Sequence, residues 1–142
     1  MGEAGGTGVW QPGDAWPHYE EDPIKSAALF READVQVVVV RLTTVYQTGN
    51  GAGAAQVAER FATETGATPG IKPTAGVRGL PSAKCFIRPD GWKPITPDSM
   101  GRDAWHFKCI ARADRYAFIA YSDDEKDVKQ QTAAQYRILA GK

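Results

Sequence analysis

The sequence predicts an α+β domain with two layers, in which an antiparallel β-sheet of about four or five strands carries its helices on one face. The order of the expected elements supports this class, because a helix, one or two strands and a second helix precede three strands and a last helix. The strongest local pattern is a hairpin, since AWHFKCIA and RYAFIAY are separated by a tight turn at residues 112–115.

The first half of the domain is predicted to contain two helices and a β-branched run. Pro23 suits the first position of a helix in EDPIKSAALFREAD, and the Asp22 carboxylate suits its N-cap. The run VQVVVVRLTTVYQT, residues 35–48, predicts one long strand or two strands with a bend near Arg41. GNGAG then leads into a helix with an apolar stripe at helical spacing, formed by Ala54, Val57, Ala58, Phe61 and Ala62.

The second half is predicted to hold three strands and a closing helix. Residues 66–81 are rich in Gly, Pro and Thr and indicate a loop, and AKCFIR at 83–88 indicates a short strand before a second loop. Ser122 and Glu125 have the spacing of a capping box at the start of the last helix. The apolar stripe of that helix is expected to contain Val128, Thr132, Tyr136 and Leu139.

Length and composition favour one folded unit. We expect residues 1–21 to form a flexible leader or linker and residues 22–142 to form a single α+β domain. The 17 basic residues equal the 17 acidic residues, which argues against a dedicated nucleic-acid-binding protein. No apolar run approaches the ~20 residues that cross a bilayer, and the N-terminus lacks the pattern of a signal peptide.

The two cysteines are placed on apolar strand faces. Alternation along a strand puts Cys85 with Ile87, and Cys109 with Phe107 and Trp105. If the two strands are neighbours, the sulfurs are able to meet in a disulfide. Spacing alone leaves a second interpretation open, in which both cysteines are buried free thiols.

No catalytic residue, metal or cofactor is expected. His106 and Cys109 are three apart, which places them on opposite faces of a strand and prevents a shared ion or a Cys–His nucleophile. GNGAG does not have the G-x-G-x-x-G spacing of a dinucleotide site, and DDEKD is typical of a solvated helix N-terminus. An alternative is a small-molecule pocket enzyme whose chemistry lies in the loops 66–81 and 88–103.

A basic sheet face is predicted opposite the cysteines. Such a face suits an anionic ligand, such as a lipid headgroup or a phosphate, although a solvated outer face covered by Lys and Arg stems is the simpler interpretation. The residues that share this face, around the Phe86 ring, are Lys84, Arg88, His106, Lys108 and Arg112.

The stretch YAFIAY, residues 116–121, matches six places of the strand motif with which RNA-recognition domains stack bases. Asp114 and Arg115 occupy the places where that motif has a basic residue and a glycine. The first strand also lacks the partner aromatic, and the last helix is not followed by the strand that the fold needs. No nucleic-acid partner is therefore expected.

Several segments together resemble a known family. They are HYEEDPIKSAALFREADV, TTVYQTGNGAGAAQVAERF, GLPSAKCF and HFKCIARADRYAFIAYSDDEKDVKQQTAAQYRIL. From about Trp16 onward the chain resembles the C-terminal domain of uncharacterised actinobacterial (mycobacterial- and nocardial-type) cell-envelope lipoproteins and secreted proteins. The signal peptide, lipid-attachment cysteine and upstream domain of those proteins are missing here, so either the chain is a fragment or it is not exported.

The resemblance implies a location, a disulfide and a class of function. Cys85 and Cys109 stand where that family places its cysteine pair, so a disulfide is expected. The location is expected to be the cell envelope or the extracellular space. The expected function is non-enzymatic binding, with an unknown envelope protein or lipid as the partner.

Overall fold

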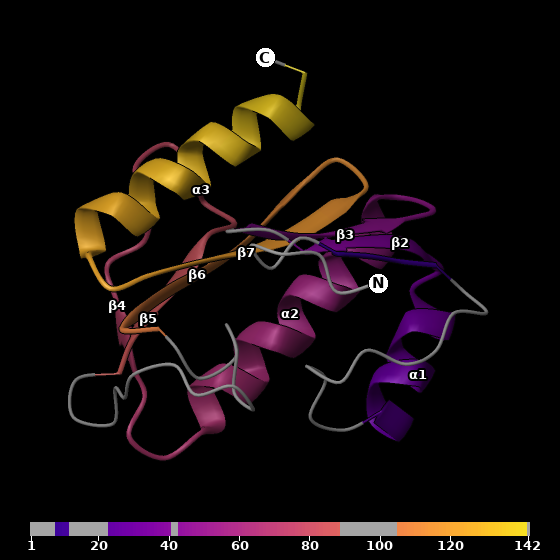
Figure 1. Ribbon diagram of the computed structural model, residues 1–142, viewed down its shortest axis with the longest axis horizontal. Coiled ribbons are helices and arrows are strands. Elements are labelled where there is room, and N and C mark those ends of the chain that lie inside the picture. Colours follow the sequence, from indigo (N-terminus) through magenta and orange to yellow (C-terminus); the bar gives the residue numbers. More distant parts are fainter. Residues whose placement is uncertain (1–7, 12–22, 41–42, 89–104, 142) are drawn as a thin grey trace.

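The computed structural model describes residues 8–11, 23–40, 43–88 and 105–141. These residues form one antiparallel sheet with the strand order β1-β2-β3-β7-β6-β5-β4. The strands are β1 (Gly8–Trp10), β2 (Val35–Val40), β3 (Thr43–Thr48), β4 (Lys72–Thr74), β5 (Lys84–Ile87), β6 (Phe107–Ala113) and β7 (Tyr116–Ser122). The helices are α1 (Pro23–Glu32), α2 (Gly51–Ala67) and α3 (Glu125–Leu139) (Figure 1).

The predicted α+β class with an antiparallel sheet is confirmed, and the described sheet has more strands than the four or five expected. Of the two alternatives predicted for residues 35–48, two strands are confirmed, because β2 and β3 are separate strands that pair with each other. Arg41, where the bend was expected, lies outside the described residues. The two further strands are β1, in the predicted leader, and β4, in the predicted loop 66–81. Both contain three residues, which is too short for period-two alternation to be visible in the sequence.

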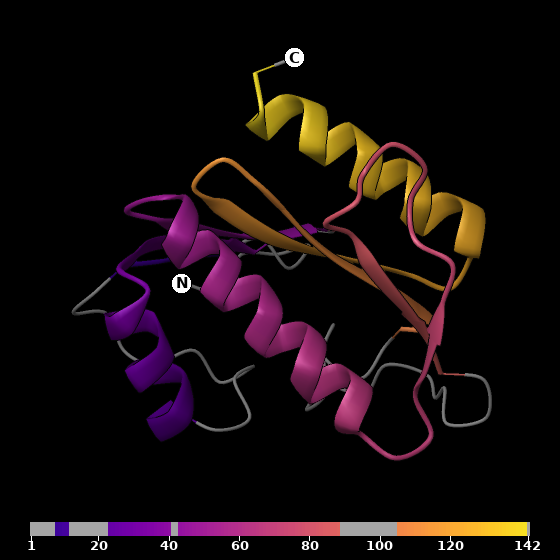
Figure 2. The same ribbon diagram turned by 180° about the vertical axis from the view of Figure 1, so that it is seen from behind.

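The helices cover both faces of the sheet, whereas the sequence analysis expected them on one face. Successive residues of β7 explain the difference: Ala117 and Ile119 pack with α1 and α2, while Phe118 and Ala120 pack toward α3. All four side chains are buried. Because this central strand is apolar on both faces, both faces need cover, and α3 lies across the sheet from α2 (Figures 1 and 2).

The predicted hairpin is confirmed as β6 and β7. Ala113 pairs with Tyr116, so Asp114 and Arg115 form a two-residue turn. Asp114 has a φ of 54°, and Asp is one of the few non-glycine residues that readily adopt such a conformation. The start of α1 at Pro23 is also confirmed, while Asp22, its predicted cap, lies outside the described residues.

Two side chains cap the longer helices. The Asn50 carboxamide oxygen accepts from the Gly53 N–H at 2.8 Å and caps α2. At α3 the predicted capping box is wrong, because Asp124 is the N-cap and accepts from the Asp127 N–H at 2.8 Å. Ser122 lies two residues before that cap, and its hydroxyl donates to the Asp127 carboxylate at 2.7 Å.

Gly53 is the residue where the first turn of α2 approaches the end of α1 most closely. A β-carbon at Gly53 would collide with the Ala33 carbonyl oxygen and come within 3.1 Å of the Thr48 side chain. A β-carbon at Gly51, in the same turn, would lie 3.6 Å from the Asp114 carbonyl oxygen, an ordinary contact.

We therefore expect Gly53→Ala to lower the free energy of unfolding by about 1–3 kcal/mol, as overpacking does. Gly51→Ala is the matched control, and it should leave that free energy nearly unchanged or raise it slightly, because alanine favours helix. Urea unfolding followed by circular dichroism measures both variants. Equal unfolding midpoints for the two would contradict the close packing at Gly53.

Candidate functional site

Cys85 and Cys109 form a disulfide between neighbouring strands. They stand directly opposite each other in β5 and β6, with Cα atoms 4.1 Å apart and sulfurs 2.09 Å apart. Their exposed fractions are 3% and 0%. The disulfide that the family resemblance implied is confirmed, and both cysteines are buried with Phe107 beside them. The prediction that Trp105 shares their face is wrong, because Trp105 packs with Phe86 and Ile110 in the core cluster of the opposite face.

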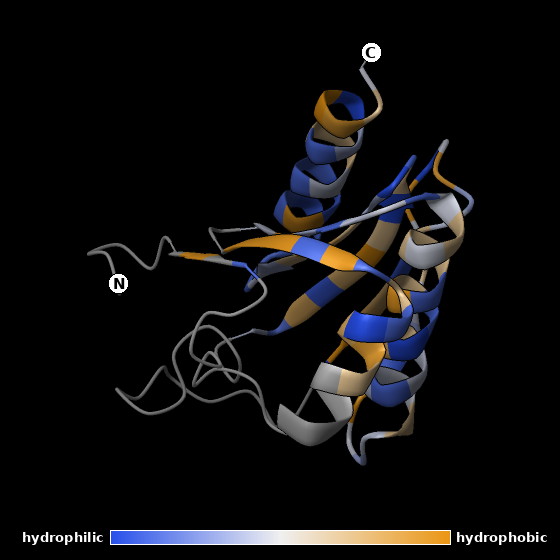
Figure 3. Cartoon of the chain, turned by 90° about the vertical axis from the view of Figure 1, so that its right-hand side faces the viewer, coloured by the Kyte–Doolittle hydropathy of each residue, from blue (hydrophilic) through white to orange (hydrophobic). Residues whose placement is uncertain are grey.

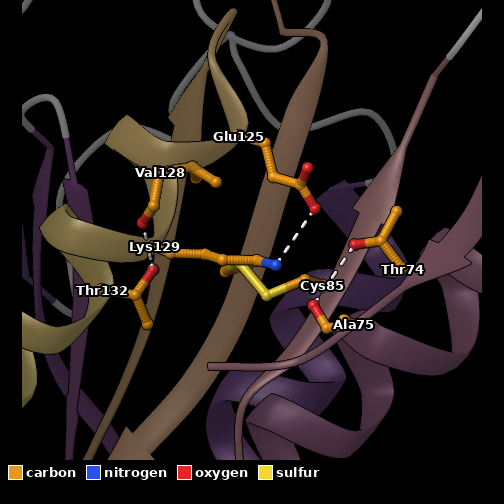
Figure 4. Close-up of a disulfide and its surroundings, with 8 residues drawn as sticks. Thr74, Ala75, Cys85, Glu125, Val128, Lys129 and Thr132 are labelled. Carbon is orange, nitrogen blue, oxygen red and sulfur yellow. Dashed lines mark hydrogen bonds and ion pairs between the residues drawn. A yellow bond between two sulfur atoms is a disulfide. The ribbon is translucent and has the colours of Figure 1, made fainter. Parts of the chain in front are cut away.

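The disulfide lies under the N-terminal half of α3. Val128 packs in the same buried cluster as the two sulfurs, and Figure 4 shows Val128, Lys129 and Thr132 of α3 around Cys85. Lys129 forms an ion pair with Glu125 at 3.0 Å on the helix above. Because protein atoms cover both sulfurs, the bond has a structural role and not that of an exchanging redox pair.

The five residues of the predicted basic face differ in exposure. Lys84 and Arg112 are exposed, whereas Arg88, His106 and Lys108 are partly buried. The face is not a solvated outer surface, because Phe86 on it is buried with α2 in the main core.

Trp105 organises the partly buried cations of this face. The Arg88 guanidinium lies 4.3 Å and the Lys108 ammonium 5.3 Å from the centre of the Trp105 ring, which is itself buried. Lys108 also donates to the Thr65 hydroxyl of α2 at 3.1 Å. These contacts stabilise the packing of α2 on the sheet, and binding of an anionic ligand to the five residues stays a prediction.

The opposite face has an open apolar surface that the sequence analysis missed. Beside α3, the sheet floor is formed by Val37, Val39 and Val45, all partly buried. A groove of about 240 Å³ lies over this floor, lined by Val37, Val39, Thr43, Val45, Gln47, Tyr116, Gln135 and Leu139. Val9 of β1 pairs with Val39 and continues the floor to the sheet edge, with 51% of its surface exposed.

Two of the polar groups that line this groove stand side by side. Gln47 and Tyr116 are paired across β3 and β7, and Gln47 donates to the Gln36 carboxamide oxygen at 2.9 Å. The Arg115 guanidinium lies 5.6 Å from the centre of the Tyr116 ring. Among the described residues that line the groove none is charged, so it suits an apolar ligand whose orientation a few amides and hydroxyls would fix.

One signal in the sequence pointed to this surface. The run VQVVVV is apolar at nearly every position, which is typical of a strand buried on both faces and not of a half-exposed one. The run by itself predicts only a strand. The partial exposure of Val37 and Val39 depends on where α3 lies in the fold.

A protein-family model matches nearly the whole chain. Residues 3–142 match the family described as domain of unknown function (DUF7373) C-terminal. This chain belongs to the DUF7373 C-terminal domain family. No curated protein and no solved structure matches the chain, so the family supplies no activity to compare with the groove.

Two searches of the described residues gave negative results. Within the described ranges, no helix is long and apolar enough to cross a membrane. In the same part of the chain, no three or more His, Cys, Asp or Glu side chains are gathered as a metal ion would need.

Removing the disulfide should weaken the fold without changing it. The bond closes a loop with a sequence separation of 24, so the double variant Cys85→Ala/Cys109→Ala should lose about 3–4 kcal/mol of unfolding free energy. The measurement is urea unfolding of the variant beside the oxidised wild type. As a control, wild-type protein denatured without reductant should titrate with no free thiol, and two free thiols would contradict the bond.

Proposed function

We propose that this domain is a non-enzymatic binding module of an actinobacterial cell-envelope lipoprotein or secreted protein, and that it binds through the apolar groove beside α3. The observation that carries the proposal is the open floor of Val37, Val39 and Val45. Ligand sites are concave and mostly apolar, with a few polar groups that fix the ligand's orientation, and the lining of this groove has that composition.

The chemistry of the groove supports binding over catalysis. Its floor is aliphatic, and its polar lining groups are the amides of Gln47 and Gln135 and the hydroxyls of Thr43 and Tyr116. None of these groups is a strong base or an activated nucleophile at neutral pH. A ligand in the groove would remove apolar surface from water, and this burial contributes ~25 cal/mol of binding free energy per Å².

The disulfide supports an exported location. Disulfides persist in oxidising compartments and are rare in the reducing cytosol. Cys85 and Cys109 join two adjacent strands of the sheet, so the fold has its full stability only where this bond forms. The resemblance to envelope proteins agrees with this location.

Binding of bis-ANS, an anionic fluorescent dye that binds apolar surfaces, to the folded chain tests the groove. Wild type should bind the dye, and Val39→Asp should weaken binding about tenfold, because the loss of one buried valine's contribution is near 1.4 kcal/mol. Val39→Thr, which is nearly the same size, should weaken binding less.

The matched control is Ile138→Asp, which removes an apolar side chain that is 72% exposed on α3 and does not line the groove. This variant should bind the dye as wild type does. Circular dichroism and thermal unfolding check that each variant is folded. Binding that is lost equally in Ile138→Asp and Val39→Asp, or absent from folded wild type, would refute the groove as the binding site.

A further inference from the structure

The two faces of β2 are covered unequally. On one face Val38 is 1% exposed, because Leu29 and Phe30 of α1 pack with it and with Tyr46; the Phe30 and Tyr46 rings are 5.7 Å apart. On the other face Val37 and Val39 are only partly buried.

Figure 3 shows orange, hydrophobic segments along the strands of the sheet. The composition of β2, with valine at five of its six positions, suits a strand that is covered on both faces. A second apolar element is therefore expected over β1, β2 and β3, beside α3.

The path of the chain indicates where that element comes from. The matching family is described as a C-terminal domain, so its members carry polypeptide on the N-terminal side. The chain enters the sheet at β1, where Gly8 pairs with Val40 and Val9 pairs with Val39. β1 is an edge strand of the described sheet, so the described chain begins beside the floor.

We propose that the groove is the docking surface for the N-terminal part of the full-length protein, and this inference rests on the proposed function of the groove. The docked patch is apolar and uncharged, because the described lining has no charge to pair with one. Gln47 and Gln135, at the rim, would hydrogen-bond polar groups of that patch.

Because the N-terminal part and this domain would belong to one chain, a small contact is sufficient to keep them together. The floor of Val9, Val37, Val39 and Val45 is a modest area for two separate proteins. Tethering through β1 gives an effective concentration on the order of millimolar, so an affinity that is weak between free partners still keeps the parts together.

The test compares bis-ANS binding by the full-length protein and by the 142-residue chain. We expect binding to be at least about tenfold weaker in the full-length protein, because its N-terminal part occupies the groove. Equal, Val39-dependent affinity in both proteins would overturn the docking proposal and leave the proposed function standing. Absence of dye binding from the folded 142-residue chain would instead refute the proposed function.

A second measurement does not depend on the dye. Broadening of the Val39 methyl resonances by a soluble paramagnetic agent is compared in the full-length protein and in the 142-residue chain. The broadening should be much weaker in the full-length protein, and equal broadening in the two proteins would overturn the proposal.

Discussion

The constraint on which the rest of this structure depends is that its central strand is apolar on both faces. Phe118 and Ala120 of β7 face α3, while Ala117 and Ile119 face α1 and α2. A strand of this kind is stable only when both faces are removed from water. The placement of α3 across the sheet from α2 follows, and the partly exposed floor over β1 to β3 lies beside the C-terminal half of α3.

The two halves of the sheet are stabilised in different ways. In the half that contains β5 and β6, the Cys85–Cys109 bond lies under α3, and Trp105 with Lys108 fixes α2 on the opposite face. Among the described residues, the half that contains β1 and β2 has a helix on one face only, and the proposed binding groove lies on its other face.

The class and most of the elements could be predicted because local patterns determine them. The Pro23 helix start, the Asp114–Arg115 turn and the helical stripe around Val57 need no long-range information. The face of the sheet that α3 covers depends on which strands become neighbours. The alternation of side chains along β7 therefore predicts that face only when the partner strands of β7 are known. The groove was not predicted for the same reason, because it exists only where Val37 and Val39 are left partly exposed by α3.

The unequal cover of β2 can be measured directly. Valine methyl resonances of the 142-residue chain, recorded with a soluble paramagnetic agent, report the exposure of each side chain. We predict strong broadening for Val9, Val37, Val39 and Val45, and little for Val38 and Val57, which are buried. Equal protection of Val38 and Val39 would contradict the account, because β2 would then have no open face.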